Sequence, residues 1–469
     1  MNEWELIELL GGAVVIVLAG WWLRHLLRFP IQMSLFDICI GGTAFFAGSG
    51  PWLGFIYGKG KLPVEDGVRL FVTFAIILTY IATLVLIGYM AHRGFSRSGH
   101  TSIKRADFTI ASLSAFYNKI SPSFVLITLC GVWALRIIIG AVYGQWASNG
   151  GTEEDGVEKL PYMFYVVYSL SSALASGCLL WSSRVFWMRP RSSGWGIALI
   201  ILILELAWAF TIGRRPMFGW LVFVAVGYFS SGNTLQIKHV FVGAIFLFCF
   251  AIFLFPLFQR VRYYRYLPQI QSQNALSRYF TALEMALTNS DNYSEHHYHE
   301  NMAERPLLHR FICRIKEKQE THEVMGGEAF WTSFVKVIPG VIMSNKIDMP
   351  VTEVRIQEWY GLPNSDMSNT WPATGCADFG LLGGVMAGLG MGGVIWLSEL
   401  MARAAKRSIP FVSLCCVGTM IDVLYQFEID PTASWVTLRA LLLLTLGGWI
   451  LRFFSKMKSR DGEVRFSRS

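Results

Sequence analysis

Residues 193–230 read SGWGIALIILILELAWAFTIGRRPMFGWLVFVAVGYFS, which is two apolar runs joined by a short basic turn. An α-helix needs roughly 20 apolar residues to cross the hydrocarbon core of a bilayer. The runs at 193–212 and 217–230 therefore predict two membrane-spanning helices with a tight connection between them.

The same pattern recurs along the chain. Of the 469 residues, 53% are hydrophobic and only 15% are charged, whereas a soluble domain carries about a quarter charged residues. We expect an all-α polytopic membrane protein with about eleven transmembrane helices and no nucleic-acid partner. The other nine runs lie near 9–27, 33–56, 68–91, 122–143, 161–183, 240–258, 377–399, 409–427 and 434–453.

The distribution of Lys and Arg predicts the topology, because short cytoplasmic loops carry an excess of both residues. Basic residues gather in alternate connections, whereas Glu153, Glu154 and Asp155 lie in one of the others. We expect the N-terminus outside the membrane and the C-terminus inside. The basic residues of the alternate connections and of the tail are Arg24, Arg28, Arg93, Arg97, Lys104, Arg105, Lys119, Arg184, Arg189, Arg191, Lys238, Arg403, Lys406, Arg407, Lys456, Lys458 and Arg460.

One long polar segment, 259–376, interrupts the membrane pattern. Its stretch 274–288 places apolar residues on one helical face, and 328–338 is apolar enough to rest on the membrane surface. We expect a helical cap over the outer end of the bundle. The predicted divisions are 1–258 with spans one to eight, 259–376 as the periplasmic cap, 377–455 with spans nine to eleven, and 456–469 as a cytoplasmic tail.

Two arginine-rich stretches are candidates for binding an anion. Arg214 and Arg215 lie in the turn between spans six and seven, and guanidinium groups pair bidentately with phosphate oxygens. The alternative is interfacial snorkelling of the same side chains. The start of the long segment carries Arg262, Tyr264 and Arg265, with Arg278 following. These residues either anchor the chain at the interface or line a site for a charged headgroup or a sugar.

Ionisable residues inside the predicted spans form a further set. Arg136, Glu205, Asp422 and Arg439 are costly at membrane depth and usually face a partner or a cavity. Arg136 and Arg439 lie nearer the outer side. They either add to an outward-facing cationic pocket or form structural pairs with the acids.

Other polar and cysteine residues give weaker indications. The run Glu295–Glu300 contains three histidines, but it lacks a helical i, i+4 pair and is better explained as a solvated loop tip. We expect neither a metal nor a cofactor. The eight cysteines form no CxxC pair and are typical of small buried side chains, with a Cys313–Cys376 disulfide left open. Asp378 either faces the cap or complements the dipole of the helix that it begins.

The order of these parts resembles the Wzy-type O-antigen polymerases, and more distantly the O-antigen ligases. The likeness covers roughly residues 190–400. Its elements are the arginine turn 213–216, the long late loop that starts with Arg, and an "IP…K" element made by Ile338, Pro339 and Lys346. The last element is the acid-Phe-Gly sequence that begins at Asp378.

The resemblance implies a metal-independent glycosyltransferase of the bacterial inner membrane. Such an enzyme polymerises undecaprenyl-diphosphate-linked repeat units at the periplasmic face for O-antigen, capsule or exopolysaccharide. A flippase and a chain-length regulator of the pathway are the partners implied, besides membrane lipids. Arg214 and Arg215 would stabilise the diphosphate, and Asp378 or His322 would orient or deprotonate the acceptor. The substrate-binding residues implied are Arg262, Arg265, Arg278, Tyr264, Lys346, Arg136 and Arg439.

Three alternatives remain open at this point. A ligase would transfer the glycan to another acceptor, a transporter or flippase would move the polysaccharide, and an assembly protein would have no catalytic role. A transporter usually shows broken helices or mid-membrane charges in paired halves. The groups singled out here lie mainly at the outer face and in the cap, which favours surface chemistry.

Overall fold

The computed structural model covers residues 1–469, and the chain is helical wherever it has regular structure among the described residues. The described residues are 3–57, 67–94, 109–143, 162–188, 194–212, 214–233, most of 257–288, 308–338, 342–343, 349–363, 369–407, 409–425 and 430–466.

Described helices lie at ten of the eleven predicted positions. The remaining predicted span is 240–258, and its residues 240–256 lie outside the described part of the chain. In the described part of the chain, six helices are long and apolar enough to cross a membrane, and three apolar helices are shorter. The protein is therefore a helical membrane protein. The main helices are α1 (Glu3–Arg28), α2 (Leu35–Tyr57), α3 (Gly67–Gly94), α5 (Pro122–Tyr143), α6 (Tyr162–Met188), α7 (Trp195–Ile212), α8 (Arg214–Ser230), α18 (Gly383–Lys406), α19 (Pro410–Leu424) and α20 (Pro431–Phe466).

The shorter elements connect these helices or build the cap. Two of the connecting elements, α4 and η4, lie between α3 and α5, and the cap elements lie between α8 and α18. The short elements are η1 (Pro30–Gln32), α4 (Ile110–Leu113), η4 (Tyr117–Lys119), α11 (Pro268–Gln271), α12 (Ala275–Thr288), α14 (Leu308–Lys318), α15 (Glu328–Val335), α16 (Thr352–Tyr360), α17 (Trp371–Phe379) and η8 (Gly380–Leu382).

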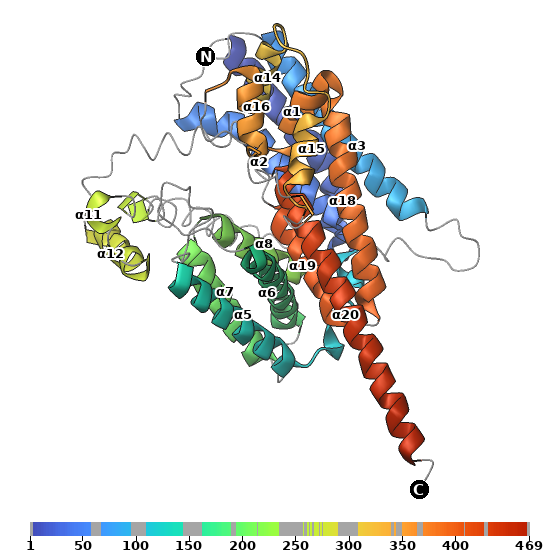
Figure 1. Ribbon diagram of the computed structural model, residues 1–469. Coiled ribbons are helices and arrows are strands. Elements are labelled where there is room, and N and C mark those ends of the chain that lie inside the picture. The colour runs from blue at the N-terminus through green and yellow to red at the C-terminus, as the bar shows by residue number, and fades with distance from the viewer. Residues whose placement is uncertain are drawn as a thin grey trace.

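The bundle has two parts that meet along α6 and α19. In Figure 1, α5 to α8 stand on one side of α18 to α20, and α11 and α12 lie beyond them. The helices α6 and α19 touch through small residues. A Cβ atom on Gly418 would lie 2.4 Å from the Ser176 carbonyl oxygen, and one on Gly177 would lie 2.6 Å from Cys415 Sγ. Small residues allow this backbone approach, which is how helices without a hydrophobic drive between them gain packing energy in a membrane.

One end of the bundle carries the cap. Helix α14 is tied to the starts of α1 and α3. The Nε2–H of His309 donates to Glu8 at 3.1 Å, and Arg69 pairs with Glu320 at 2.8 Å. Burial lowers the pKa of His309, so its imidazole serves as a neutral donor there.

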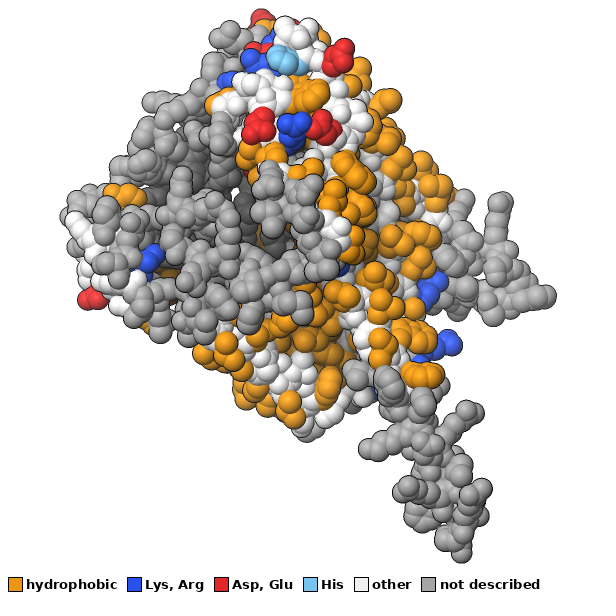
Figure 2. All heavy atoms as spheres, viewed as in Figure 1, with side chains coloured by type: hydrophobic (Ala, Val, Ile, Leu, Met, Phe, Trp, Pro, Cys, Tyr) orange, Lys and Arg blue, Asp and Glu red, His pale blue; other side chains and the backbone are white. Residues whose placement is uncertain are grey.

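The opposite end holds the described parts of the basic connections, including Lys119 and Arg184. The hydroxyl of Ser413, at the start of α19, donates to the Leu113 carbonyl at 2.6 Å, and Arg184, at the end of α6, donates to the Ser114 carbonyl at 3.0 Å. The two ends are separated by the 24 residues of α18, or about 36 Å at 1.5 Å per residue. In Figure 2 charged side chains gather over the cap, and apolar side chains cover the surface below them.

The predicted ninth span, 377–399, is wrong at its start. The chain forms a separate helix, α17, which ends at Phe379. Gly380 then adopts φ +57°, where a side chain would be strained, and α18 follows. The backbones of Gly375 and Gly383 lie in contact, because a Cβ on Gly375 would be 2.2 Å from the Gly383 oxygen. Asp378 therefore ends one helix and does not begin the span. Cys313 and Cys376 are both free, so they do not form a disulfide.

Candidate functional site

Asp378 lies near the end of α17 and is completely buried. Its Oδ1 accepts the backbone N–H of Ala329 at 2.9 Å, and its Oδ2 accepts that of Phe330 at 2.8 Å. Both groups belong to the first turn of α15, whose N–H groups have no partner within the helix. A carboxylate also complements the positive end of the helix dipole. Asp378 thus caps α15, a helix 49 residues earlier in the chain.

The capping role of Asp378 predicts a loss of stability when its carboxylate is removed. The variant Asp378→Ala should lose about 2 kcal/mol or more of stability, because two buried N–H groups lose their acceptor. Asp378→Asn should fall between it and the native protein, since the amide keeps one acceptor oxygen. The midpoint of heat-induced aggregation of the purified protein in detergent measures both. The exposed acid Glu358 of the cap provides the matched control, as Glu358→Ala.

A general base at position 378 would behave differently. Asp378→Asn would then abolish product formation while leaving the thermal midpoint at its native value. That outcome would contradict the capping role.

A hollow of about 390 Å³ opens at Gly380, two residues after this buried acid. Within it, Lys316 Nζ donates to Gln319 Oε1 at 2.7 Å. The Gln319 amide donates to the Tyr360 hydroxyl at 3.0 Å and to the Cys376 carbonyl at 2.7 Å. The hollow is lined by Lys316, Gln319, Glu320, Thr321, His322, Glu323, Val324 and Gly380.

The Tyr360 hydroxyl both accepts and donates a hydrogen bond in this network. Burial raises the pKa of Tyr360 to about 12, so its hydroxyl stays protonated and donates to the Ala377 carbonyl at 2.8 Å. His322 is exposed, and its Nδ1 lies 2.9 Å from the Thr321 hydroxyl. The hollow therefore presents an ammonium group, carboxylates and an imidazole to solvent, a set that suits a hydroxyl-rich or charged ligand.

His322 lines the hollow, and its ring centre lies 6.3 Å from that of Tyr360, whose hydroxyl donates to the Ala377 carbonyl next to Asp378. The structure also adds residues that the sequence reasoning missed, namely Lys316, Gln319 and Tyr360. The charged face of 308–318 was a usable signal for Lys316. The roles of Gln319 and Tyr360 had no such signal, because their partners lie 57 and 17 residues away.

A second region forms where α7 meets α8. The Tyr279 hydroxyl of α12 donates to the Phe210 carbonyl near the end of α7 at 3.5 Å. Tyr264 is buried and belongs to the same apolar cluster as Tyr279. Arg278, next to Tyr279, donates to the Gln273 carbonyl at 3.2 Å. Helix α12 therefore lies beside Phe210, near the end of α7 and four residues before Arg214 in the sequence.

Arg214 and Arg215 are the first two residues of α8. Position 215 is one turn before Gly219, on the same face of the helix. That face meets the end of α19, since a Cβ on Gly219 would lie 2.3 Å from the Tyr425 hydroxyl oxygen. Nothing further is described for the side chains of Arg214 and Arg215, and Gly213, Arg262, Arg265 and Lys346 lie outside the described residues.

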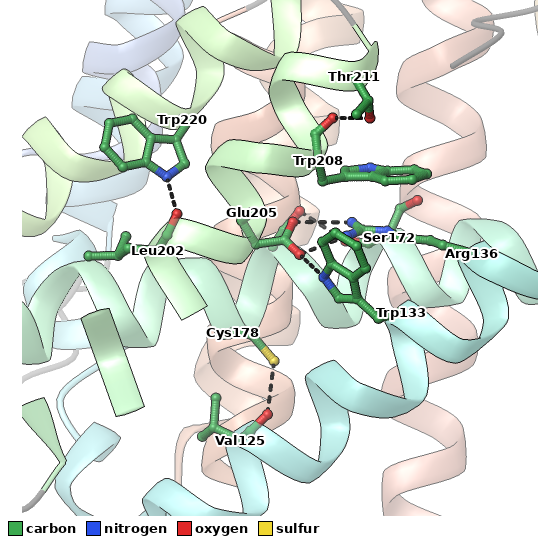
Figure 3. Close-up of polar contacts among 11 residues, drawn as sticks. Val125, Trp133, Arg136, Ser172, Cys178, Leu202, Glu205, Trp208, Thr211 and Trp220 are labelled. Carbon is green, nitrogen blue, oxygen red and sulfur yellow. Dashed lines mark hydrogen bonds and ion pairs between the residues drawn. The ribbon is translucent and has the colours of Figure 1, made fainter. Parts of the chain in front are cut away.

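Arg136 and Glu205 form a buried ion pair between α5 and α7, with 7% and 6% of their surfaces exposed. Two guanidinium nitrogens of Arg136 donate to the two Glu205 oxygens, at 2.6 and 3.2 Å. Figure 3 shows the two side chains pointing toward each other beside Trp133 and Trp208. The Trp133 indole donates to Glu205 at 3.2 Å, and the Arg136 guanidinium lies 4.5 Å from the Trp208 ring centre. Arg136 could have lined a cationic pocket or formed a structural pair with an acid. The structure shows the pair with an acid.

Arg439 is also engaged by the protein. Its guanidinium donates to the Val337 carbonyl at 2.7 Å, just after the end of α15. In the described part of the chain, no group of three or more His, Cys, Asp or Glu side chains could hold a metal. The histidines of 295–300 lie outside it.

The described candidates Tyr264, Arg278, His322 and Asp378 fall into two regions at one end of the bundle. The cap region holds His322 and Asp378 beside the start of α18. The second region holds Tyr264, Arg278 and the start of α8. The end of α8 lies against the end of α6, because a Cβ on Gly227 would be 2.6 Å from that of Ser183. The start of α8 therefore lies at the capped end.

Comparison with protein-family models, with curated proteins and with solved structures finds no match for this chain.

Proposed function

We propose that the protein is a glycosyltransferase of the bacterial inner membrane that polymerises undecaprenyl-diphosphate-linked oligosaccharide repeats. It acts at the periplasmic face during synthesis of O-antigen, capsule or exopolysaccharide. It works beside the flippase and the chain-length regulator of the same pathway.

The observation that carries this proposal is the shared location of the two candidate regions. The start of α8, helix α12 and the cap hollow all lie at one end of the apolar bundle. A lipid-linked diphosphate has its charge at the membrane boundary and its sugars beyond it. Cations at the helix ends would face the diphosphate, and the polar cap beyond them would face the sugars.

The chemistry is a substitution at the anomeric carbon of the donor repeat. An acceptor hydroxyl forms the new glycosidic bond, the bond from carbon to the diphosphate oxygen breaks, and undecaprenyl diphosphate leaves. Arg214 and Arg215 stabilise the charge that develops on the leaving group, as preorganised cations do without reorganisation. The hydroxyl proton passes to a base, and the exposed His322 imidazole serves in this role.

Deleting the gene and separating the surface polysaccharide by gel electrophoresis tests the proposal. The expected result is accumulation of single repeat units with loss of the long-chain ladder. Restoring the intact gene should restore the ladder. Loss of all export would instead identify a flippase, and full-length polymer that is not attached to its acceptor would identify a ligase.

A further inference from the structure

The short cap helix α15 runs beside the beginning of α20. The rings of Phe334 and Trp435 have centres 5.7 Å apart, and Arg439 donates to the Val337 carbonyl at 2.7 Å. Phe334 of α15 meets Trp435, and Val337, two residues after the end of α15, meets Arg439 farther along α20, so the two helices run in the same direction. The cap-side end of α20 is therefore accompanied by α15.

The position of α20 in the membrane indicates how deep in the bilayer α15 lies. The apolar part of α20, Pro431–Ile450, has 20 residues and is about 30 Å long, which equals the hydrocarbon thickness of a bilayer. Arg439 lies about 12 Å along this segment from its capped end. The end of α15 consequently lies level with the interior of the span.

The two faces of α15 differ in their surroundings. Its residues Ala329, Thr332, Ser333 and Val335 are buried against the protein. Trp331 and Phe334, three residues apart on the other face, are 56% and 43% exposed. An aqueous surface would hydrate these rings at a free-energy cost, whereas Trp at a membrane interface is common.

The exposed apolar surface of α15 continues onto that of α20. Leu442, Leu446 and Ile450 are exposed along the span, and Val351, at the start of α16, is 56% exposed. Thr352 lies beside Thr432 of α20, with their hydroxyl oxygens 3.2 Å apart. Figure 2 shows apolar side chains covering the surface from α15 downward over α18 and α20.

The two ends of α15 have polar partners from the protein. Asp378 accepts two N–H groups at the start, and Arg439 donates to a carbonyl just beyond the end. A bilayer supplies no such partners, so backbone at membrane depth has to be satisfied internally. With eight residues, α15 is too short to span the membrane.

We propose that α15 is inserted into the bilayer leaflet on the capped side, with Trp331 and Phe334 against phospholipid. The cap is thereby part of the membrane surface and not only a soluble lid. Arg439, an arginine inside a span, serves to close the end of this inserted helix. The proposal does not depend on the reaction that the protein catalyses.

Photocrosslinking in phospholipid nanodiscs tests the insertion. The photoreactive residue p-benzoylphenylalanine is placed at 331, at 334, at the span position 446 and at the exposed cap position 358. Mass spectrometry of the irradiated protein should find phospholipid adducts at 331, 334 and 446 and none at 358. The substitutions at 331 and 334 exchange one exposed aromatic residue for another, so the fold is retained.

Adducts at 446 without adducts at 331 and 334 would overturn the proposal, because the probe would then be working while α15 stayed outside the lipid. A lipid adduct at 358 as strong as that at 331 would also overturn it. Size-exclusion chromatography of each variant confirms that the tested protein is folded.

Discussion

Replacing Arg136 with Met is expected to destabilise the protein by about 3–5 kcal/mol, because Glu205 is then left as an uncompensated buried charge. The two guanidinium hydrogen bonds to Glu205 disappear, and the Trp133 indole becomes its remaining partner. Little folded protein should be recovered from the membrane. Fluorescence-detected size-exclusion chromatography after heating measures the folded fraction.

The double variant Arg136→Met/Glu205→Leu is the matched control. Replacing a buried ion pair by apolar residues of similar volume is often neutral or stabilising, so the double variant should recover most of the folded protein. If the single and double variants are equally stable, the pair has no structural role. Polymer formation by the double variant would further show that Arg136 does not bind substrate.

The second large effect is expected at Arg215. Arg215→Ala should leave the protein in the membrane at its native level but reduce polymer formation about 100-fold or more. Losing one preorganised donor to a developing anion typically costs this much, or about 2.7–4 kcal/mol. Gel electrophoresis of the surface polysaccharide measures chain growth, and an immunoblot of the membrane fraction measures the protein.

Two further variants make this test specific. Arg215→Lys keeps the charge and loses the bidentate geometry, so activity should be intermediate. Lys119→Ala removes an exposed cation from the opposite end of the bundle and should leave the polymer unchanged. Chains of native length from Arg215→Ala would refute the role of this residue.

The helix positions could be predicted because they depend on local sequence. Apolar runs such as 68–91 and 122–143 must be about as long as a bilayer is thick, and α3 and α5 lie there. The amphipathic stretch 274–288 likewise becomes α12, because its apolar residues recur at helical spacing. Both signals can be recognised within a window of 20 residues.

The break at Gly380 could not be predicted in the same way. The stretch from Trp371 to Lys406 is predominantly apolar, so composition indicates one long span. The chain turns because Gly375 and Gly383 let α17 pack directly on α18, and this contact exists only once the turn has formed. The sequence therefore predicts that Asp378 begins the following helix, whereas it lies near the end of α17.

The sequence by itself determined that this is a helical membrane protein with a structured polar segment between its membrane helices, since length, hydropathy and charge order act locally. Only the tertiary structure decided what the charged residues do. Asp378 caps α15 across 49 residues, Arg136 neutralises Glu205 across 69, and Arg439 reaches Val337 across 102. Burial makes an unpaired charge costly, so each such residue takes the partner that packing places beside it, and that partner cannot be recognised from spacing along the chain.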